Sequence, residues 1–431
     1  PLDIARDVRY QSVMIFTRRP SSSARASCRT CTSWVLLCLA VWAPGCGGSS
    51  SMGGDASVDS GSVDLSIGDQ GMCNPGPVTT ATVNPSPPGA TTTSSTLFDG
   101  RCGAAVGQLF PPSAPWNQSV RETCVDPRSN AIIQYLEAVV DGSQTFRIDL
   151  GNAEDDYGFN PLAADSSTTT YPFDTTDEFY TPHCDEVPIP VPATGRLEGE
   201  PDYTCAGDGD CHLTVLETAG CELFEMWRAN DVLGDFAGGC LAVWDTTSVG
   251  TDLRGLSCTS ADAAGLPILP MLVTPLQVRA GAIRHALRFI LPNEAVQRHV
   301  YVRPATHNPL TEERHGQPAS GPNGTMPPPY GVRLRLRADF DTSALSPGAQ
   351  AMAEALKEYG MIHADGGNVT FIASNDTYAG ASWGDADIDL GPDDLRDAGM
   401  SWTDFEVVSD LDDVSSMEDV ECSRTPRMEL P

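Results

Sequence analysis

Glu225 is the acidic residue in this sequence whose neighbours best suit acid–base chemistry. It lies in the segment Cys221-Glu-Leu-Phe-Glu-Met-Trp227, directly between Phe224 and Met226. Apolar neighbours remove water from a carboxylate and raise its pKa, so the acid keeps its proton nearer to neutral pH. Such a group can protonate a leaving group, as the general acid of a glycosidase does. We therefore predict Glu225 as a proton donor, with a structural ion pair to an arginine as the alternative.

Glycoside hydrolysis needs a second carboxylate, and Asp365 is our prediction for it. Glu222 cannot serve, because residues 222 and 225 of one strand point to opposite faces. Asp365 lies in His363-Ala-Asp-Gly-Gly367, near the end of a predicted strand. In this scheme Asp365 is the nucleophile or the base, opposite the proton donor.

Three histidines lie at predicted strand ends or in loops, where side chains from different strands can meet. His285 starts a predicted strand, His307 follows another, and His363 precedes Asp365. An imidazole changes charge near neutral pH, so it can act as an acid or base or bind a metal. We predict His285 and His307 as catalytic residues. We predict His363 and Arg284 as substrate-binding residues, and a hydrogen-bonded structural role is the alternative for each histidine.

Arg333, Arg335 and Arg337 alternate with apolar residues in the clearest predicted strand, residues 332–338. Side chains two residues apart in a strand share a face, so these guanidinium groups are predicted to form one positive stripe. Guanidinium groups bind carboxylates and sulfates through paired hydrogen bonds, which suits a uronic-acid or sulfated polysaccharide. Trp116 is predicted to stack on a sugar ring, with a core position as the alternative. The alternative for the arginines is a solvated sheet face paired with acids.

A structural calcium ion is the one cofactor for which the sequence offers ligands. Asp155-Asp156 and Asp208-Gly-Asp210 place carboxylates at the short spacings found in calcium loops. Neither is followed by a full twelve-residue ligand pattern, and an acidic turn is the alternative for Asp208 and Asp210. The sequence contains no His-Glu-x-x-His zinc motif and no phosphate-binding glycine-rich loop. We therefore predict no catalytic metal and no nucleotide cofactor.

Three segments of the chain resemble a widespread family of uncharacterised exported bacterial proteins. They are residues 110–117 (FPPSAPWN), residues 260–270 (SADAAGLPILP) leading into 281–289 (GAIRHALRF), and residues 357–365 (KEYGMIHAD). The resemblance covers nearly all of residues 97–409 and implies a common fold. It implies no reaction, so an activity on an extracellular polymer is inferred from the compartment instead.

Short apolar runs separated by turns dominate the chain from about residue 97. Residues 213–216 and 223–227 are predicted to form one strand pair, and residues 286–291 and 300–303 a second. Residues 349–359 are the one predicted amphipathic helix, which Gly360 ends. We therefore predict a mainly β fold, a single antiparallel domain of β-sandwich or jelly-roll type over residues 97–409.

Residues 1–45 are predicted to be a lipoprotein signal peptide, with Met14 as its natural start. Arginines precede the apolar run 34–41, which is too short to span a bilayer as a helix. Ala43-Pro-Gly-Cys46 resembles a bacterial lipobox, which implies lipid attachment at Cys46. An ordinary secretory peptide or a weak anchor helix is the alternative. In Gram-negative lipoproteins Gly47, where aspartate would cause retention, implies sorting to the outer membrane or cell surface.

Residues 46–96 are rich in Gly, Ser and Asp and then in Pro and Thr, which predicts a flexible tether. Residues 410–431 are predicted to be an acidic tail held by Cys422. Ten cysteines follow Cys46, and an even number in an exported chain predicts disulfides. Cys205–Cys211 is the easiest bridge to predict, and the other pairings cannot be deduced from the sequence.

The chain has 26 basic and 58 acidic residues and a formal net charge of −32. The segment before Cys46 holds six Arg and two Asp, so removing its +4 leaves −36. Such a surface repels nucleic acid and anionic lipid, so membrane contact is predicted through the lipid anchor alone. The predicted partner is an extracellular polysaccharide and the predicted reaction is its hydrolysis. The alternatives are a polysaccharide lyase with a histidine base and an arginine, and a non-catalytic carbohydrate-binding or adhesion lipoprotein.

Overall fold

The computed structural model describes residues 96–428 except for 141, 143–144, 152–157, 177–180, 208, 233, 249–253, 369 and 419. The predicted signal peptide, the lipidation site Cys46 and the tether therefore lie outside the described residues. Asp155, Asp156 and Asp208, the predicted calcium ligands other than Asp210, lie outside them as well. No helix in the described part of the chain has the length and apolar character needed to cross a membrane.

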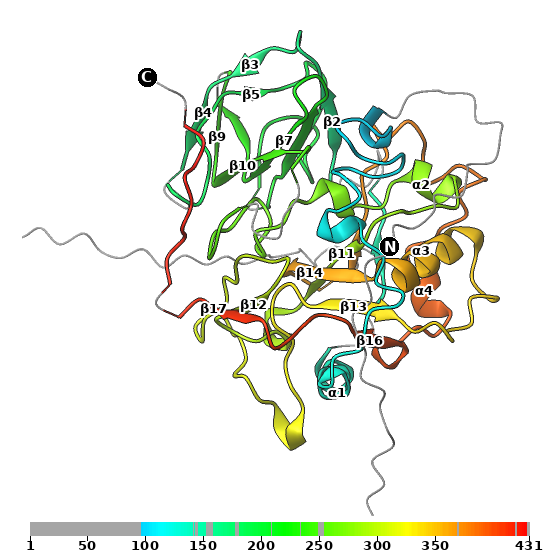
Figure 1. Cartoon of the computed structure of the whole chain (residues 1–431). Helices are drawn as coiled ribbons and strands as arrows, with labels where there is room; N and C mark the ends of the chain where they lie inside the picture. Colours follow the sequence, from blue (N-terminus) through cyan, green and yellow to red (C-terminus); the bar gives the residue numbers. More distant parts are fainter. Residues whose placement is uncertain are drawn as a thin grey trace, which may run out of the picture. The chain divides into compact units, whose positions relative to one another are not determined.

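Strand is more abundant than helix, as predicted, but it is divided among several small sheets (Figure 1). The sheets are mixed, because β2 pairs with β6 and β11 pairs with β14 in parallel. The prediction of a purely antiparallel domain was therefore wrong. Parallel neighbours come from distant parts of the chain, and local alternation of apolar residues does not reveal such pairs.

The first four-stranded sheet has a face on each of two hydrophobic cores. Its strands β10, β7, β6 and β2, in spatial order, are Cys240–Asp245, Glu222–Trp227, Leu213–Glu217 and Pro161–Ala164. The hairpin predicted here forms between β6 and β7. Phe224 and Met226 belong to the smaller core, whereas Leu223 and Trp227 belong to the larger one. Glu225 shares the face of Leu223 and Trp227, because side chains alternate along a strand.

Short strands complete the smaller core. They are β3 (Thr170–Tyr171) with β5 (Ile189–Pro190), and β4 (Phe173–Thr175) with β9 (Asp235–Gly238) and β8 (Asn230–Val232). Phe173, Ile189 and Phe236 contribute to the same core as Phe224. This core therefore forms within one stretch of the chain, roughly residues 162–243.

The second four-stranded sheet lies in the larger core. Its strands β11, β14, β13 and β16, in spatial order, are Leu287–Leu291, Met361–Gly366, Arg333–Leu336 and Phe405–Val407. Two small sheets flank it, β1 (Ile148–Asp149) with β15 (Phe371–Ile372) and β12 (Val300–Val302) with β17 (Val414–Ser416). The strands predicted at 286–291 and 300–303 form as β11 and β12, but each pairs with another strand. The second predicted strand pair was therefore wrong.

Four α-helices are described, and two of them are longer than one or two turns. They are α1 (Ser129–Val139), α2 (Pro275–Arg279), α3 (Pro347–Glu358) and α4 (Asp394–Asp397). Short 3-10 helices occur at Thr96–Phe98, Pro115–Asn117, Leu269–Met271 (η3), Asn293–Ala295, Pro322–Gly324 and Trp402–Asp404. α3 is the helix predicted from sequence, and the Ser346 hydroxyl caps it by accepting from the Ala349 amide. α1 was missed, although Ile132, Ile133 and Leu136 bury one of its faces.

Four disulfides support the prediction of an exported, oxidised chain. They join Cys102 to Cys221, Cys184 to Cys240, Cys205 to Cys211 and Cys258 to Cys422. The bridges at Cys205–Cys211 and through Cys422 were predicted. The other partners are more than 50 residues apart, so only the folded chain brings them together.

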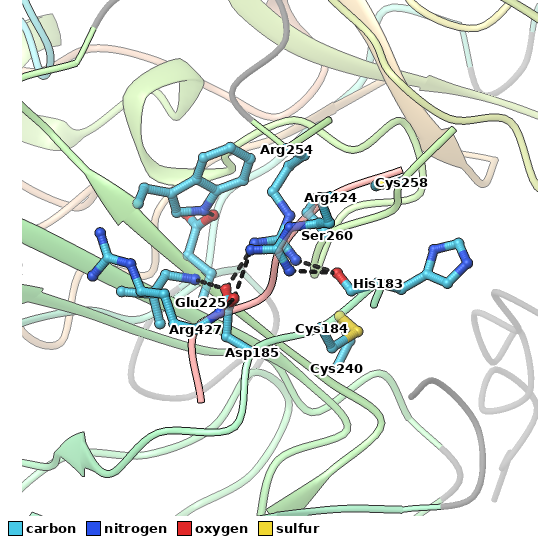
Figure 2. Close-up of polar contacts among 12 residues, drawn as sticks. His183, Cys184, Asp185, Glu225, Cys240, Arg254, Cys258, Ser260, Arg424 and Arg427 are labelled. Carbon is cyan, nitrogen blue, oxygen red and sulfur yellow. Dashed lines mark hydrogen bonds and ion pairs between the residues drawn. A yellow bond between two sulfur atoms is a disulfide. The ribbon is translucent and has the colours of Figure 1, made fainter. Parts of the chain in front are cut away.

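The acidic C-terminal segment is fastened to both sheet regions (Figure 1). After β17 pairs with β12, Cys422 bonds to Cys258 and Arg424 reaches Asp185. Figure 2 shows the side chains of Arg254 and Arg424 around Asp185. The Asp185 carboxylate accepts hydrogen bonds from Nη1 of Arg254 at 2.8 Å and from Nη2 of Arg424 at 2.6 Å. Asp185 is completely buried and also accepts from the amides of Val243 and Arg427. One carboxylate therefore holds the C-terminal segment beside β10.

We expect Asp185→Ala to lower the free energy of unfolding by about 3–5 kcal/mol, because Arg254 would be left buried without its partner. Denaturant titration measures the loss. The matched control is Asp412→Ala, since Asp412 pairs with Arg128 but its side chain is 88% exposed. The control should unfold almost as the unchanged protein does. Equal destabilisation by both substitutions would show that Asp185 does not hold the C-terminal segment.

Candidate functional site

The predicted arginine stripe is not a free surface. Arg333 and Arg335 are each 8% exposed and lie against the segment that contains residues 115–123. Arg333 donates to the backbone carbonyls of Pro115, Gln118 and Tyr359. Arg335 donates to the carbonyls of Val120, Arg121 and Thr123 and, at 2.9 Å, to Glu406. The prediction that they bind substrate was wrong, because their donors are used within the protein.

Arg337, Arg284 and Trp116 do not join Asp365 either. The exposed Arg337 pairs with Asp339 at 3.3 Å. Trp116 is 2% exposed and packs edge-on against Phe110, so its predicted sugar-stacking role was wrong and the core alternative holds. Arg284 precedes β11, whereas Asp365 lies near the end of β14. Because β11 and β14 are parallel, these two residues lie at opposite ends of the strand pair.

The three predicted functional histidines are buried and have structural surroundings. His285 is fully buried between the Ala286 carbonyl and the Gln277 amide group, and burial lowers its pKa to about 4. Burial likewise lowers the pKa of His307 to about 3, and its Nδ1 donates to a carbonyl at 2.7 Å. Burial lowers the pKa of His363 to about 3, and its ring packs on Tyr330. All three rings are buried away from solvent, so the predicted acid–base and binding roles have no support here.

Glu225 has the raised pKa that the sequence predicted, but it does not face solvent. Burial raises its pKa to about 7, and its exposed fraction is zero. Its oxygens accept from the amides of Ile268 (2.9 Å) and Leu269 (2.8 Å) and from the Trp244 indole (2.9 Å). The prediction of Glu225 as a donor to substrate was therefore wrong. Its carboxylate instead anchors the start of η3 beneath the first sheet.

Asp365 belongs to a group of three ionisable residues, Asp262, Arg288 and Asp365, that we call the carboxylate cluster. Arg288 binds Asp262 through Nε and Nη2, both at 2.8 Å, and Asp365 through Nη2 at 3.3 Å. Asp262 is fully buried and Arg288 is 3% exposed, but the side chain of Asp365 is 18% exposed. The cluster therefore has one member that solvent can reach.

The surroundings of Asp365 favour its protonated form. Burial, followed by the charge of Asp262, raises the pKa of Asp365 well above its ordinary value, and Arg288 only partly offsets this. Two carboxylates this close cannot both ionise at low cost. Because Arg288 holds Asp262 with two hydrogen bonds, Asp262 keeps the charge. Asp365 is thus an acid that retains its proton and is partly open to solvent.

Asp210, which precedes β6, interacts electrostatically with the carboxylate cluster. Asp210 is partly exposed, and its Oδ1 accepts from the Trp227 indole at 2.9 Å. The charge of Asp210 also contributes to the raised pKa of Asp365. The charges of His212 and Glu198 interact with that of Arg288. Binding sites often form where two structural regions meet, so this junction is our candidate functional site.

Arg288 and Asp262 were missed from the sequence, although both carry a signal. Arg288 interrupts the apolar strand Leu287-Arg-Phe-Ile-Leu291, and Asp262 lies among small apolar residues in Ser260-Ala-Asp-Ala-Ala264. A charged residue inside a buried segment needs a partner. Each of these two residues could therefore have been used to predict an ion pair with another part of the chain. All three cluster residues lie within the segments 260–270, 281–289 and 357–365, on which the predicted resemblance was based.

Two other patterns do not form sites. Residues 380–384 (GASWG) match the Gly-x-Ser-x-Gly pattern of serine hydrolases, but Ser382 lies in an exposed turn without the strand–turn–helix that the pattern requires. Its hydroxyl donates to Asp376 at 2.7 Å.

Glu200, Cys205 and Cys211 are close enough to share a metal ion. The two cysteines form a disulfide, so they cannot bind a metal as thiolates.

Comparison with family models, with curated proteins and with solved structures found no match for this chain. The candidate site is therefore interpreted from its own geometry and charges.

We expect Glu225→Gln to remove a pH dependence from folding stability. The folded-state pKa of about 7 exceeds the ordinary 4.5, so the contribution of Glu225 is lost as pH rises from about 4.5 through 7. The loss amounts to about 3 kcal/mol. Glutamine cannot ionise, so the variant should not lose this stability. The free energy of unfolding of the variant, minus that of the unchanged protein, should therefore increase as pH rises over this range.

Denaturant titration at several pH values measures this difference. Glu312→Gln is the control, since the side chain of Glu312 is 83% exposed. A difference between Glu225→Gln and the unchanged protein that stays constant with pH would contradict the raised pKa.

Proposed function

We propose that the protein is a glycoside hydrolase of the cell surface, held at the outer membrane by a lipid on Cys46, with Asp365 as its proton donor. One observation carries this proposal: Asp365 is partly exposed, and burial together with the charge of Asp262 raises its pKa well above the ordinary value. Raised pKa values of this kind are what general acids of glycosidases require. Asp365 thus takes the role first predicted for Glu225.

The reaction follows from the cluster and the residue that faces it. Asp365 protonates the glycosidic oxygen, and the carboxylate left behind is stabilised by Nη2 of Arg288. Asp210 is the second carboxylate, either activating water or attacking the sugar carbon. Its hydrogen bond from Trp227 holds it in one orientation. Asp262 does not contact substrate and serves to hold Arg288 and the proton on Asp365.

The charges around the site favour a neutral polysaccharide. Asp210 and Asp262 outnumber Arg288, and the arginines at 333 and 335 are used elsewhere. An acidic sugar would be repelled, which argues against the uronic-acid substrate first considered. A lyase also lacks support, because the candidate histidine bases are buried.

We expect the secreted chain from residue 47 onward to release reducing ends from at least one neutral polysaccharide in a panel of neutral and acidic glycans. Asp365→Asn should lower kcat by about 10²-fold or more, since it removes the transferred proton. Asp339→Asn, at an exposed carboxylate, is the matched control and should keep full activity. Ultraviolet absorbance of an unsaturated product would indicate a lyase. Binding without any product would indicate a carbohydrate-binding protein, and either result would overturn the proposal.

A further inference from the structure

Glu198 and the buried His212 form a pair that the reaction above does not use. Nδ1 of His212 lies 2.5 Å from Oε2 of Glu198, and its Nε2 lies 3.0 Å from the carbonyl oxygen of Ala261. The His212 side chain is 4% exposed. Glu198 and His212 belong to the region of the smaller core, whereas Ala261 belongs to the larger core. The imidazole therefore connects the two sides of the candidate site.

His212 is an imidazolium ion that donates both of its N–H groups. Burial opposes the charge, but the charge of Glu198 and the hydrogen bond to it raise the pKa of His212 to about 9. Asp210 adds to this effect and Arg288 opposes it, and these are the other charges that face the ring. Phe159 packs against the ring at 5.0 Å between centroids. At neutral pH one N–H is directed to a carboxylate and the other to a backbone carbonyl.

Ala261 is directly followed by Asp262, so this hydrogen bond acts on the carboxylate cluster. The Ser260 hydroxyl donates to the carbonyls of Asp262 (2.9 Å) and Leu266 (2.7 Å), which folds the segment into a tight turn. Within the described residues, His212 is the charged side chain that reaches this turn from the other core. The turn then presents Asp262 to Arg288, and Arg288 reaches Asp365.

We propose that His212, held as a cation by Glu198, is a positioning residue that fixes the orientation of Asp262 and so of Arg288 and Asp365. The catalytic consequence rests on the proposed function. The bond to the Ala261 carbonyl requires a proton on Nε2, and an ionised Glu198 requires one on Nδ1. A ring without its Nε2 proton would turn a lone pair toward the Ala261 carbonyl. Two acceptors would then face each other in a buried setting, and the turn would shift.

His212→Phe tests the positioning role, because it removes the N–H that holds the Ala261 carbonyl. We expect kcat to fall on the order of 10- to 100-fold with KM unchanged, since the turn would no longer hold Asp262, Arg288 and Asp365 in place. An unchanged kcat, or a rise in KM alone, would overturn the proposal. His315→Phe, at an exposed histidine, is the control.

Nuclear magnetic resonance of the unchanged protein tests the same coupling without any substrate or variant. The Nε–H signal of Arg288 reports its bond to Asp262, and the ring nitrogens of His212 report its charge. We expect both signals to change together as pH rises through about 9. An Arg288 signal that ignores the titration of His212 would overturn the positioning role. Coupled signals in a protein that hydrolyses no glycan would support the coupling and reject the proposed hydrolase.

Discussion

The ion pair between Arg288 and Asp262 is the interaction on which the candidate site depends. Both groups are almost completely buried, so neither charge would be tolerated without the other. Their pairing keeps the negative charge on Asp262, and that charge keeps the proton on Asp365. The turn that carries Asp262 is held from two further directions, by His212 at Ala261 and by Glu225 at the start of η3. Three buried ionisable residues, Arg288 in β11, Glu225 in β7 and His212 just before β6, therefore bond to one segment, residues 260–269.

Arginine connects parts of this acidic chain from the inside. Arg254, Arg333 and Arg335 are buried, as is Arg288, and each is bonded to a carboxylate, to several carbonyls or to both. A guanidinium group has five donors in a fixed plane, so one side chain can satisfy several acceptors from separate segments. The formal net charge of −32 counts these bases although they lie in the interior. Positive stripes read from such a sequence are therefore poor evidence of a ligand surface.

Sequence reasoning identified the elements better than their partners. The β6–β7 hairpin and α3 form where predicted, because each depends on contacts between residues close in the chain. The parallel pairing of β11 with β14 joins strands about seventy residues apart, so no local sequence pattern could predict it. Asp365 was predicted as the nucleophile or the base. Its raised pKa depends on burial and on the charge of Asp262, and only the fold brings these about.

The sequence by itself indicated the disulfide-rich character, the greater share of strand than of helix and the raised pKa of Glu225. These follow from composition and from immediate neighbours, which act over a few residues. Only the tertiary structure decided which ionisable groups face solvent and which face one another. Glu225 and Asp365 are both acids with raised pKa values, but the first is sealed beneath a sheet and the second lies at a junction of two cores. Burial and charge pairing act through space, so the chemistry of each residue was decided by neighbours that are distant in the chain.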